Sequence, residues 1–146
     1  MSNRITVLNG PNLNLLGQRQ PEIYGHETLA DVKEKCRQVA ADLGLDLRFE
    51  QSNHEGQIVD WIHEARGIAS AVIVNAGAYT HTSIALLDAL RAFAGLKVEL
   101  HLSNPAAREE FRHHSYVALG SDAVIAGLGP VGYEVALTAV ARKLEG

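Results

Sequence analysis

The sequence of 146 residues contains a single cysteine, Cys36, and lacks any apolar run long enough to cross a membrane. One cysteine cannot form an intramolecular disulfide, and no positively charged segment followed by an apolar one opens the sequence. We therefore expect a cytoplasmic protein with no membrane partner.

Basic residues are also few, because 13 Lys and Arg stand against 17 Asp and Glu, with a net charge of -4 and no clusters of either sign. Nucleic-acid binding depends on clustered Lys and Arg, so we expect no nucleic-acid partner. The seven histidines lack the His-Glu-x-x-His spacing, and no cysteine pair accompanies them, so we expect no metal site. No Gly-x-Ser-x-Gly motif indicates a serine hydrolase.

Strand-like and helical segments alternate along the chain. Helical periodicity follows Thr28, a suitable N-cap, and ends at Gly44; a second helical pattern covers 58–65, and a third runs from Pro130 to Leu144. This alternation predicts an α/β, flavodoxin-like three-layer fold with a five-stranded parallel sheet. The predicted strands are residues 5–8, 45–49, 71–74, 96–100 and 122–126.

The connection at residues 9–27 is far longer than the ~2–6 residues usual between a strand and a helix. It carries leucines and Ile23, which provide apolar surface to pack, so we do not expect disorder. We expect a single catalytic domain, residues 1–146, in which residues 18–25 form a lid over the active site.

A glycine motif, Gly127-Leu-Gly129-Pro-Val-Gly132, matches the dinucleotide-binding fingerprint. That fingerprint also requires a further strand with an acidic residue ~20 positions on, which this sequence does not supply. We interpret the motif as a tight turn into a closely packed helix, and we expect no cofactor.

Polar residues follow two predicted strands that lie side by side in such a sheet. Asn75 and His81 come after one strand, while Glu99, His101 and Ser103 lie at the end of the other. The carboxyl ends of parallel strands gather the ligand-binding loops, and a neutral imidazole transfers protons near physiological pH. These residues indicate an enzyme. The alternative that one of the two histidines is purely structural stays open.

Arg19 and Tyr24 occur together in the long connection. A phenol has a pKa near ~10 and acts as a base at neutral pH only where a cation stabilises the phenolate. Arg19 is a permanent cation of that kind. The alternative, a surface arginine beside a packed tyrosine, is also open.

Seven segments form a pattern that extends over nearly the whole chain. They are LNGPNLN (8–14), RQPEIYG (19–25), QSNHE (51–55), DWIH (60–63), NAGAYTHTS (75–83), ELHLSN (99–104) and REEFRHHS (108–115). In this order they resemble the type II 3-dehydroquinate dehydratases. There are two small departures: that family frequently has an acidic residue at the position of Gln20, and it also uses Gly at the position of Ala78.

The resemblance implies anti elimination of water from 3-dehydroquinate to 3-dehydroshikimate through an enolate, in the shikimate pathway or in quinate catabolism, without metal or Schiff base. It implies that Tyr24 is the base, that Arg19 lowers its pKa, and that His101 is the general acid. It further implies that Asn12 holds a water against the enolate oxygen and that Glu99 orients His101.

The resemblance also implies a set of substrate-binding residues and an assembly. We expect a homo-oligomer, a dodecamer built from trimers; a non-catalytic, flavodoxin-like module that binds small anions is the alternative function. Arg108 is an alternative to Arg112 for attracting the anion. The implied binding groups are the side chains of Asn75, His81, Asp88 and Arg112 and the backbone of Leu102 and Ser103.

Overall fold

The computed structural model describes residues 2–146, except for the side chain of Tyr24. Five parallel strands form one sheet in the order β2-β1-β3-β4-β5. The predicted strands and the α/β fold are thus confirmed, with small shifts at the strand ends. The strands are β1 (Arg4–Asn9), β2 (Asp46–Gln51), β3 (Ala71–Asn75), β4 (Leu96–His101) and β5 (Ala123–Ala126).

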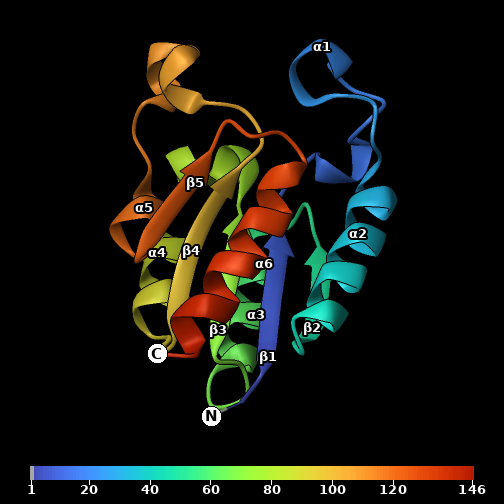
Figure 1. The fold of residues 1–146 in the computed structure, drawn as a ribbon. Coiled ribbons are helices and arrows are strands. Elements are labelled where there is room, and N and C mark those ends of the chain that lie inside the picture. Colours follow the sequence, from blue (N-terminus) through green and yellow to red (C-terminus); the bar gives the residue numbers. More distant parts are fainter. Residues whose placement is uncertain (1) are drawn as a thin grey trace.

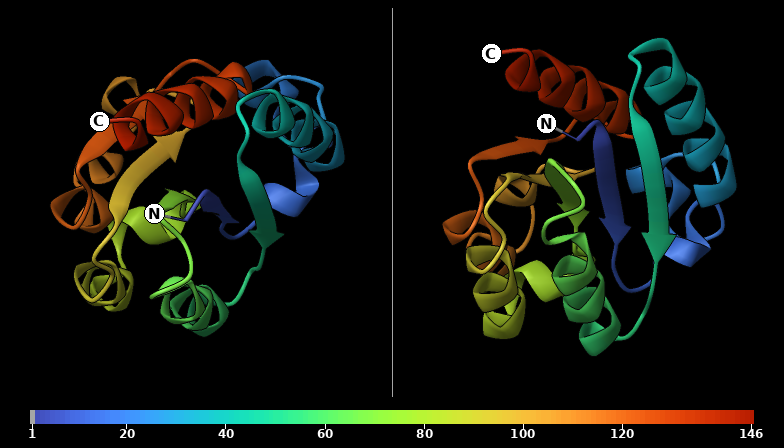
Figure 2. Two further views of the ribbon diagram at one scale, coloured as in Figure 1. Left: turned by 60° about the horizontal axis from the view of Figure 1, so that its bottom comes forward. Right: turned by 90° about the horizontal axis from the view of Figure 1, so that it is seen from below.

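Helices cover both faces of the sheet, as Figures 1 and 2 show, with α2 and α6 on one face and α3 and α4 on the other. The short helix α5 packs against α4. The α-helices are α1 (Pro21–Tyr24), α2 (Leu29–Asp42), α3 (Glu55–Ala65), α4 (Ile84–Arg91), α5 (Tyr116–Leu119) and α6 (Val131–Leu144). The 3-10 helices are η1 (Leu13–Leu15), η2 (Gly77–His81), η3 (Pro105–Ala107) and η4 (Glu110–Arg112).

The sheet separates two apolar cores, because alternate residues of each strand face opposite sides. Ile73 and Leu100 face α2 and α6, whereas Val72 and Val74 face α3 and α4. β3 is buried along its whole length, as expected for a central strand covered on both faces. This buried scaffold fixes the strand ends that carry the polar residues.

Local signals in the sequence set several helix ends. Thr28 caps α2, and its side chain and that of Asp31 form a reciprocal capping box. Gly44 adopts a φ of 72° just after α2. The predicted glycine-rich turn is also confirmed, because a Cβ on Gly132 would lie 3.0 Å from the Leu100 side chain, so α6 packs closely against β4.

The strand order reverses between β1 and β3, since the chain passes from α2 on one face to α3 on the other. Asn9 and Asn75 are paired in register where these strands end. At Gly10 the next turn approaches so closely that a Cβ would lie 2.3 Å from the Ala76 carbonyl oxygen. In Figure 1, α1 and the segment of η3 and η4 stand beyond this edge of the sheet. Within residues 2–146, no helix has the length and apolar character to span a bilayer.

Candidate active site

A cavity of about 110 Å³ lies at the carboxyl ends of the strands. In parallel sheets, ligands bind in this position, at the point where the strand order reverses. Leu13, Leu15 and Leu16 of the long connection supply part of its apolar wall. Most of the predicted site residues line it: Asn12, Arg19, Asn75, His81, His101, Leu102, Ser103 and Arg112.

His101 lies at the end of β4 with its ring in the cavity wall and 9% of its surface exposed. Its Nε2 is hydrogen-bonded to Oε2 of Glu99, two residues earlier on the same face of the strand. Glu99 does not line the cavity, and it is 1% exposed. The carboxylate of Glu99 and the imidazole of His101 are therefore hydrogen-bonded, and the orienting role of Glu99 stays a prediction.

Thr80 of η2 and Ser115, the N-cap of α5, also reach Glu99. Their hydroxyls donate to Oε2 over 2.6 and 2.7 Å, while Oε1 is buried and, among the described residues, has no partner. Burial raises the pKa of Glu99, but the hydrogen bond and charge of His101 and the bonds from both hydroxyls outweigh it, so the net pKa is lowered. We call Glu99, His101, Thr80 and Ser115 the Glu99 network.

A second polar cluster lies on the other face of the sheet. Tyr133 of α6 is 1% exposed, donates to Oδ1 of Asn9 over 2.6 Å, and accepts from Nδ2 of Asn75 over 2.9 Å. Burial raises the pKa of the phenol, despite the bond from Asn75, so the group is neutral. We call Tyr133, Asn9 and Asn75 the Tyr133 network; of its members, Asn75 borders the cavity.

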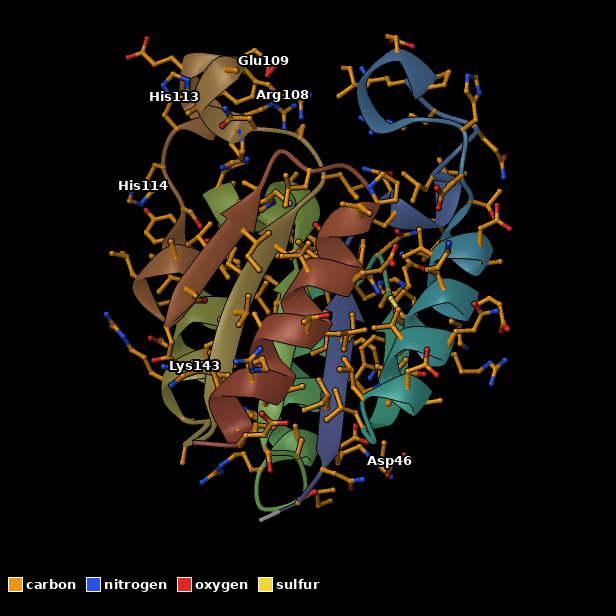
Figure 3. The ribbon with its side chains drawn as sticks, in the orientation of Figure 1. Asp46, Arg108, Glu109, His113, His114 and Lys143 are labelled. Atoms are coloured by element: carbon orange, nitrogen blue, oxygen red, sulfur yellow. The ribbon has the colours of Figure 1, made fainter. Side chains whose placement is uncertain are left out.

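Three arginines, Arg19, Arg108 and Arg112, line the cavity. Arg112 pairs with Glu109 and lies 5.1 Å from the centre of the Phe111 ring. This pairing lowers the pKa of Glu109. Figure 3 shows Arg108 and Glu109 on the segment above the strand ends. Guanidinium groups remain charged at all ordinary pH values, so the cavity attracts anions.

His81 is oriented by the backbone carbonyl of His114, which lies 2.8 Å from its Nδ1. A carbonyl can only accept, so Nδ1 carries the proton and Nε2 of the neutral ring is an acceptor. Asn12 has a φ of 69°, and its N–H donates to the Asn53 side chain over 3.0 Å. Both residues are thus held where they meet the cavity.

Two of the predicted site residues whose side chains the structure describes, Asp88 and Glu99, do not line the cavity. Asp88 is exposed on α4 and is not among the lining residues. Tyr24 is the last residue of α1, and its side chain lies outside the described part of the structure. Among the side chains that the structure describes, no group of three or more His, Cys, Asp or Glu is placed to hold a metal ion.

Sequence reasoning did not identify Tyr133, Thr80 and Ser115 as parts of the site. The partners of Tyr133 are far away in sequence, with Asn9 separated from it by 124 positions. Thr80 precedes His81 in the segment 75–83, and this position was the signal that could have identified it. Serine is common at helix N-caps, which hides a further role for Ser115.

Comparisons with known proteins agree with this geometry. Residues 3–141 match the family described as dehydroquinase class II. The 3-dehydroquinate dehydratase of Cereibacter sphaeroides is 59% identical over 146 residues, covering 100% of this chain and 99% of that protein. The 3-dehydroquinate dehydratase 2 of Agrobacterium fabrum is 61% identical over 132 residues, 90% of each chain.

Solved structures give the same result for the fold. The type II dehydroquinase from Propionibacterium acnes has a TM-score of 0.93 and 45% identity, over 97% of this chain and 98% of that chain. The type II dehydroquinase from Butyrivibrio crossotus has a TM-score of 0.91 and 40% identity, over 94% and 96%. Because sequence and fold agree over nearly its full length, the chain belongs to the class II dehydroquinase family.

Proposed function

We propose that this protein is a type II 3-dehydroquinate dehydratase, which removes water from 3-dehydroquinate by anti elimination through an enolate. The observation that carries the proposal is the imidazole of His101 at the wall of an arginine-lined cavity, backed by the buried carboxylate of Glu99. Such an elimination needs an acid for the departing hydroxyl and cationic groups that hold an anionic substrate.

His101 is the proposed general acid. The hydrogen bond between its Nε2 and the carboxylate of Glu99 fixes the ring in the cavity wall. Once the hydroxyl has left, the same imidazole can regain a proton from solvent. Asn12, also at the cavity, is the proposed holder of a water against the enolate oxygen.

Tyr24 is the proposed base, which removes a proton from the carbon next to the ketone. The support is its position in sequence, within the same short segment as Arg19, whose side chain lines the cavity. The positive charge of Arg19 would lower the pKa of the phenol and stabilise the negative charge of the transition state. Residues 18–25 are the proposed lid, which closes over the substrate and excludes water.

The substrate is held by groups with matching chemistry. Asn75 and His81 offer donors and acceptors to ring hydroxyls, and Arg112 supplies a positive charge. The backbone after β4, at Leu102 and Ser103, is the proposed carboxylate site. No metal, cofactor or Schiff base takes part in this proposal.

The proposed role of Asp88 in binding substrate depends on the proposed assembly. Asp88 is exposed on α4 and does not line its own cavity, so contact with substrate requires a neighbouring copy of the chain. Apolar side chains exposed on and beside the edge strand β5 support association, because open apolar edges are usually covered. These side chains are Leu119, Val124, Leu128 and Val131. The proposed assembly is a dodecamer built from trimers, and light scattering would measure its mass.

The test is the ultraviolet absorbance of the conjugated enone when the purified protein is mixed with 3-dehydroquinate. We expect a rapid increase that neither EDTA nor borohydride reduces. We also expect Tyr24→Phe to keep substrate binding and to lose turnover, whereas Glu64→Gln, an exposed change on α3, keeps both. Substrate deuterated stereospecifically beside the ketone would report whether elimination is anti.

Binding without any absorbance increase would overturn the dehydratase proposal and favour the non-catalytic, anion-binding module. Loss of activity on borohydride treatment with substrate would instead indicate an imine on a lysine. Retained turnover in Tyr24→Phe would place the base on another residue.

A further inference from the structure

We propose that Thr80 and Ser115 are positioning residues for the acid: their hydroxyls hold Glu99 ionised and in one orientation, so that the carboxylate keeps His101 in place. The inference rests on the proposed role of His101 as general acid. Neither hydroxyl lines the cavity, so any effect on the reaction passes through Glu99.

The geometry concentrates every donor on one oxygen of the carboxylate. Oε2 of Glu99 receives the imidazole and the hydroxyls of Thr80 and Ser115, while Oε1 is buried without a partner within residues 2–146. The two oxygens of a carboxylate are equivalent, so a half-turn restores the same bonds, but any other rotation of the carboxylate weakens all three at once. The Glu99 side chain therefore has one favourable orientation, and it is the one that reaches His101.

Three separate elements converge on this oxygen, which is why the arrangement is rigid. Glu99 belongs to β4, Thr80 to η2, and Ser115 caps α5 by accepting from the Ala118 N–H over 3.0 Å. The two hydroxyl oxygens lie 2.8 Å apart, but each hydroxyl has given its single proton to Glu99, so neither donates to the other. Thr80 is fully buried, and water does not compete for its proton.

The same bonds keep the charge on Glu99 in a place where burial alone would neutralise it. A hydrogen bond to a carboxylate favours its ionised form, whereas desolvation favours the protonated acid. The flanking strands add no polar partner at this level, because Val74 and Val124 pair with Glu99 in register. Without the hydroxyls, protonation of Glu99 begins at higher pH and removes the negative charge behind the imidazole.

Other titratable side chains on or beside these elements bond elsewhere. Their partners are backbone carbonyls or, for the ring pair, each other. These side chains are Tyr79, His81, His114 and Tyr116. Within the described part of the chain, the imidazole of His101 is thus the charge that acts on Glu99.

The experiment removes each hydroxyl with little change of shape and follows the acid side of the pH profile of kcat. In Thr80→Val and Ser115→Ala, we expect the acid limb to move to higher pH by about one unit for each hydroxyl, the size of one bond to a charged group. Thr80→Ser and Ser115→Thr keep a hydroxyl and should restore the wild-type limb.

Two controls match these changes in burial and in helix capping. Thr6→Val removes a hydroxyl from a residue that is 2% exposed in β1, and Ser83→Ala removes the N-cap of α4, which accepts from the Leu86 N–H. We expect both to leave the acid limb in place. An equal shift in the controls, or an unmoved limb in folded Thr80→Val and Ser115→Ala, would overturn the proposal.

A measurement on the free protein separates this inference from the proposed reaction. Carbon-13 NMR of labelled glutamate side chains follows the titration of Glu99 without substrate, and Glu99→Gln assigns its signal. We expect the Glu99 titration to move to higher pH in Thr80→Val even if the protein proves inactive on 3-dehydroquinate. An unchanged titration would contradict the inference and leave the dehydratase proposal intact.

Discussion

The Glu99 network and the Tyr133 network lie on opposite faces of the sheet, at the ends of neighbouring strands, and differ in charge. Glu99 is an ionised carboxylate whose pKa is lowered, whereas Tyr133 is a phenol whose pKa is raised. Each network presents one member to the cavity, His101 in the first and Asn75 in the second. The carboxyl ends of the strands thus carry one charged network behind His101 and one neutral network behind Asn75.

The neutral Tyr133 network fixes the orientation of the Asn75 amide. The backbone carbonyl of Glu50 only accepts, so it binds Nδ2 of Asn9 and leaves Oδ1 of Asn9 to accept from Tyr133. Tyr133 has then used its single proton, and its oxygen accepts from Nδ2 of Asn75. This chain of bonds fixes which end of the Asn75 amide meets Tyr133. The charged network, in contrast, supports a residue whose proton must move.

The largest expected effect comes from neutralising the charged network. In Glu99→Gln, we expect kcat to fall by about 10²- to 10⁴-fold, the usual contribution of a general acid, with a small change in KM. The amide has no negative charge to place behind the imidazole of His101. Steady-state kinetics with the enone assay would measure both constants. A kcat close to that of the control Glu64→Gln would show that the charge behind His101 is dispensable.

A smaller effect, of a different kind, is expected in the neutral network. Tyr133→Phe leaves Oδ1 of Asn9 without its donor and Nδ2 of Asn75 without its acceptor, so the weak bond from the Gly77 N–H alone orients the Asn75 amide. We expect KM to rise about tenfold, the equivalent of about 1.4 kcal/mol, with a lesser change in kcat. Two buried polar groups lose a partner, so the free energy of unfolding should fall by about 1–3 kcal/mol.

Tyr116→Phe is the control, because it removes a half-buried tyrosine hydroxyl outside both networks. Denaturant titration and steady-state kinetics would be measured on both variants. A loss of stability in Tyr133→Phe with an unchanged KM would mean that the network serves the fold and not the orientation of Asn75.

The sequence predicted the sheet, the helix ends and the cavity residues His101 and Asn75 better than the residues that support these two side chains. Apolar runs and helical spacing located the sheet, and Thr28 and Gly44 marked the ends of α2, because these signals act within a few residues. His101 and Asn75 were identifiable for the same reason, since each directly follows or ends a strand. The supports behind them come from distant segments, which local patterns cannot connect.

For Asp88, the sequence suggested a role but could not reveal its position. The resemblance assigns it a role in substrate binding, but no pattern in the sequence reveals where a residue of α4 lies relative to the cavity. The structure places it on the surface, so its role depends on an assembly that one chain does not display. The role of Tyr24 likewise stays a prediction, because it depends on a side chain outside the described structure.

The pH dependence of unfolding offers the smallest effect, with opposite directions for the two networks. Glu99 has a folded pKa below the ordinary value of 4.5, so its contribution is present above pH 4.5 and is lost as the pH falls through the folded pKa. Tyr133 has a folded pKa above the ordinary 10.0. Its contribution is present below pH 10.0 and is lost as the pH rises through the folded pKa.

The contribution of each network to the free energy of unfolding can therefore be tested in its own pH range, acidic for Glu99 and alkaline for Tyr133. We expect Glu99→Gln to flatten the loss of unfolding free energy below pH 4.5 and Tyr133→Phe to flatten it above pH 10.0, each leaving the other limb unchanged. Exposed pairs such as Glu34 with Arg37 also lower carboxyl pKa values, so the difference between wild type and variant is the quantity to measure. Denaturant titrations across both ranges would supply it. If Glu99→Gln flattened neither limb, the buried carboxylate would already be protonated in the native protein, and the contrast between a charged and a neutral network would fail.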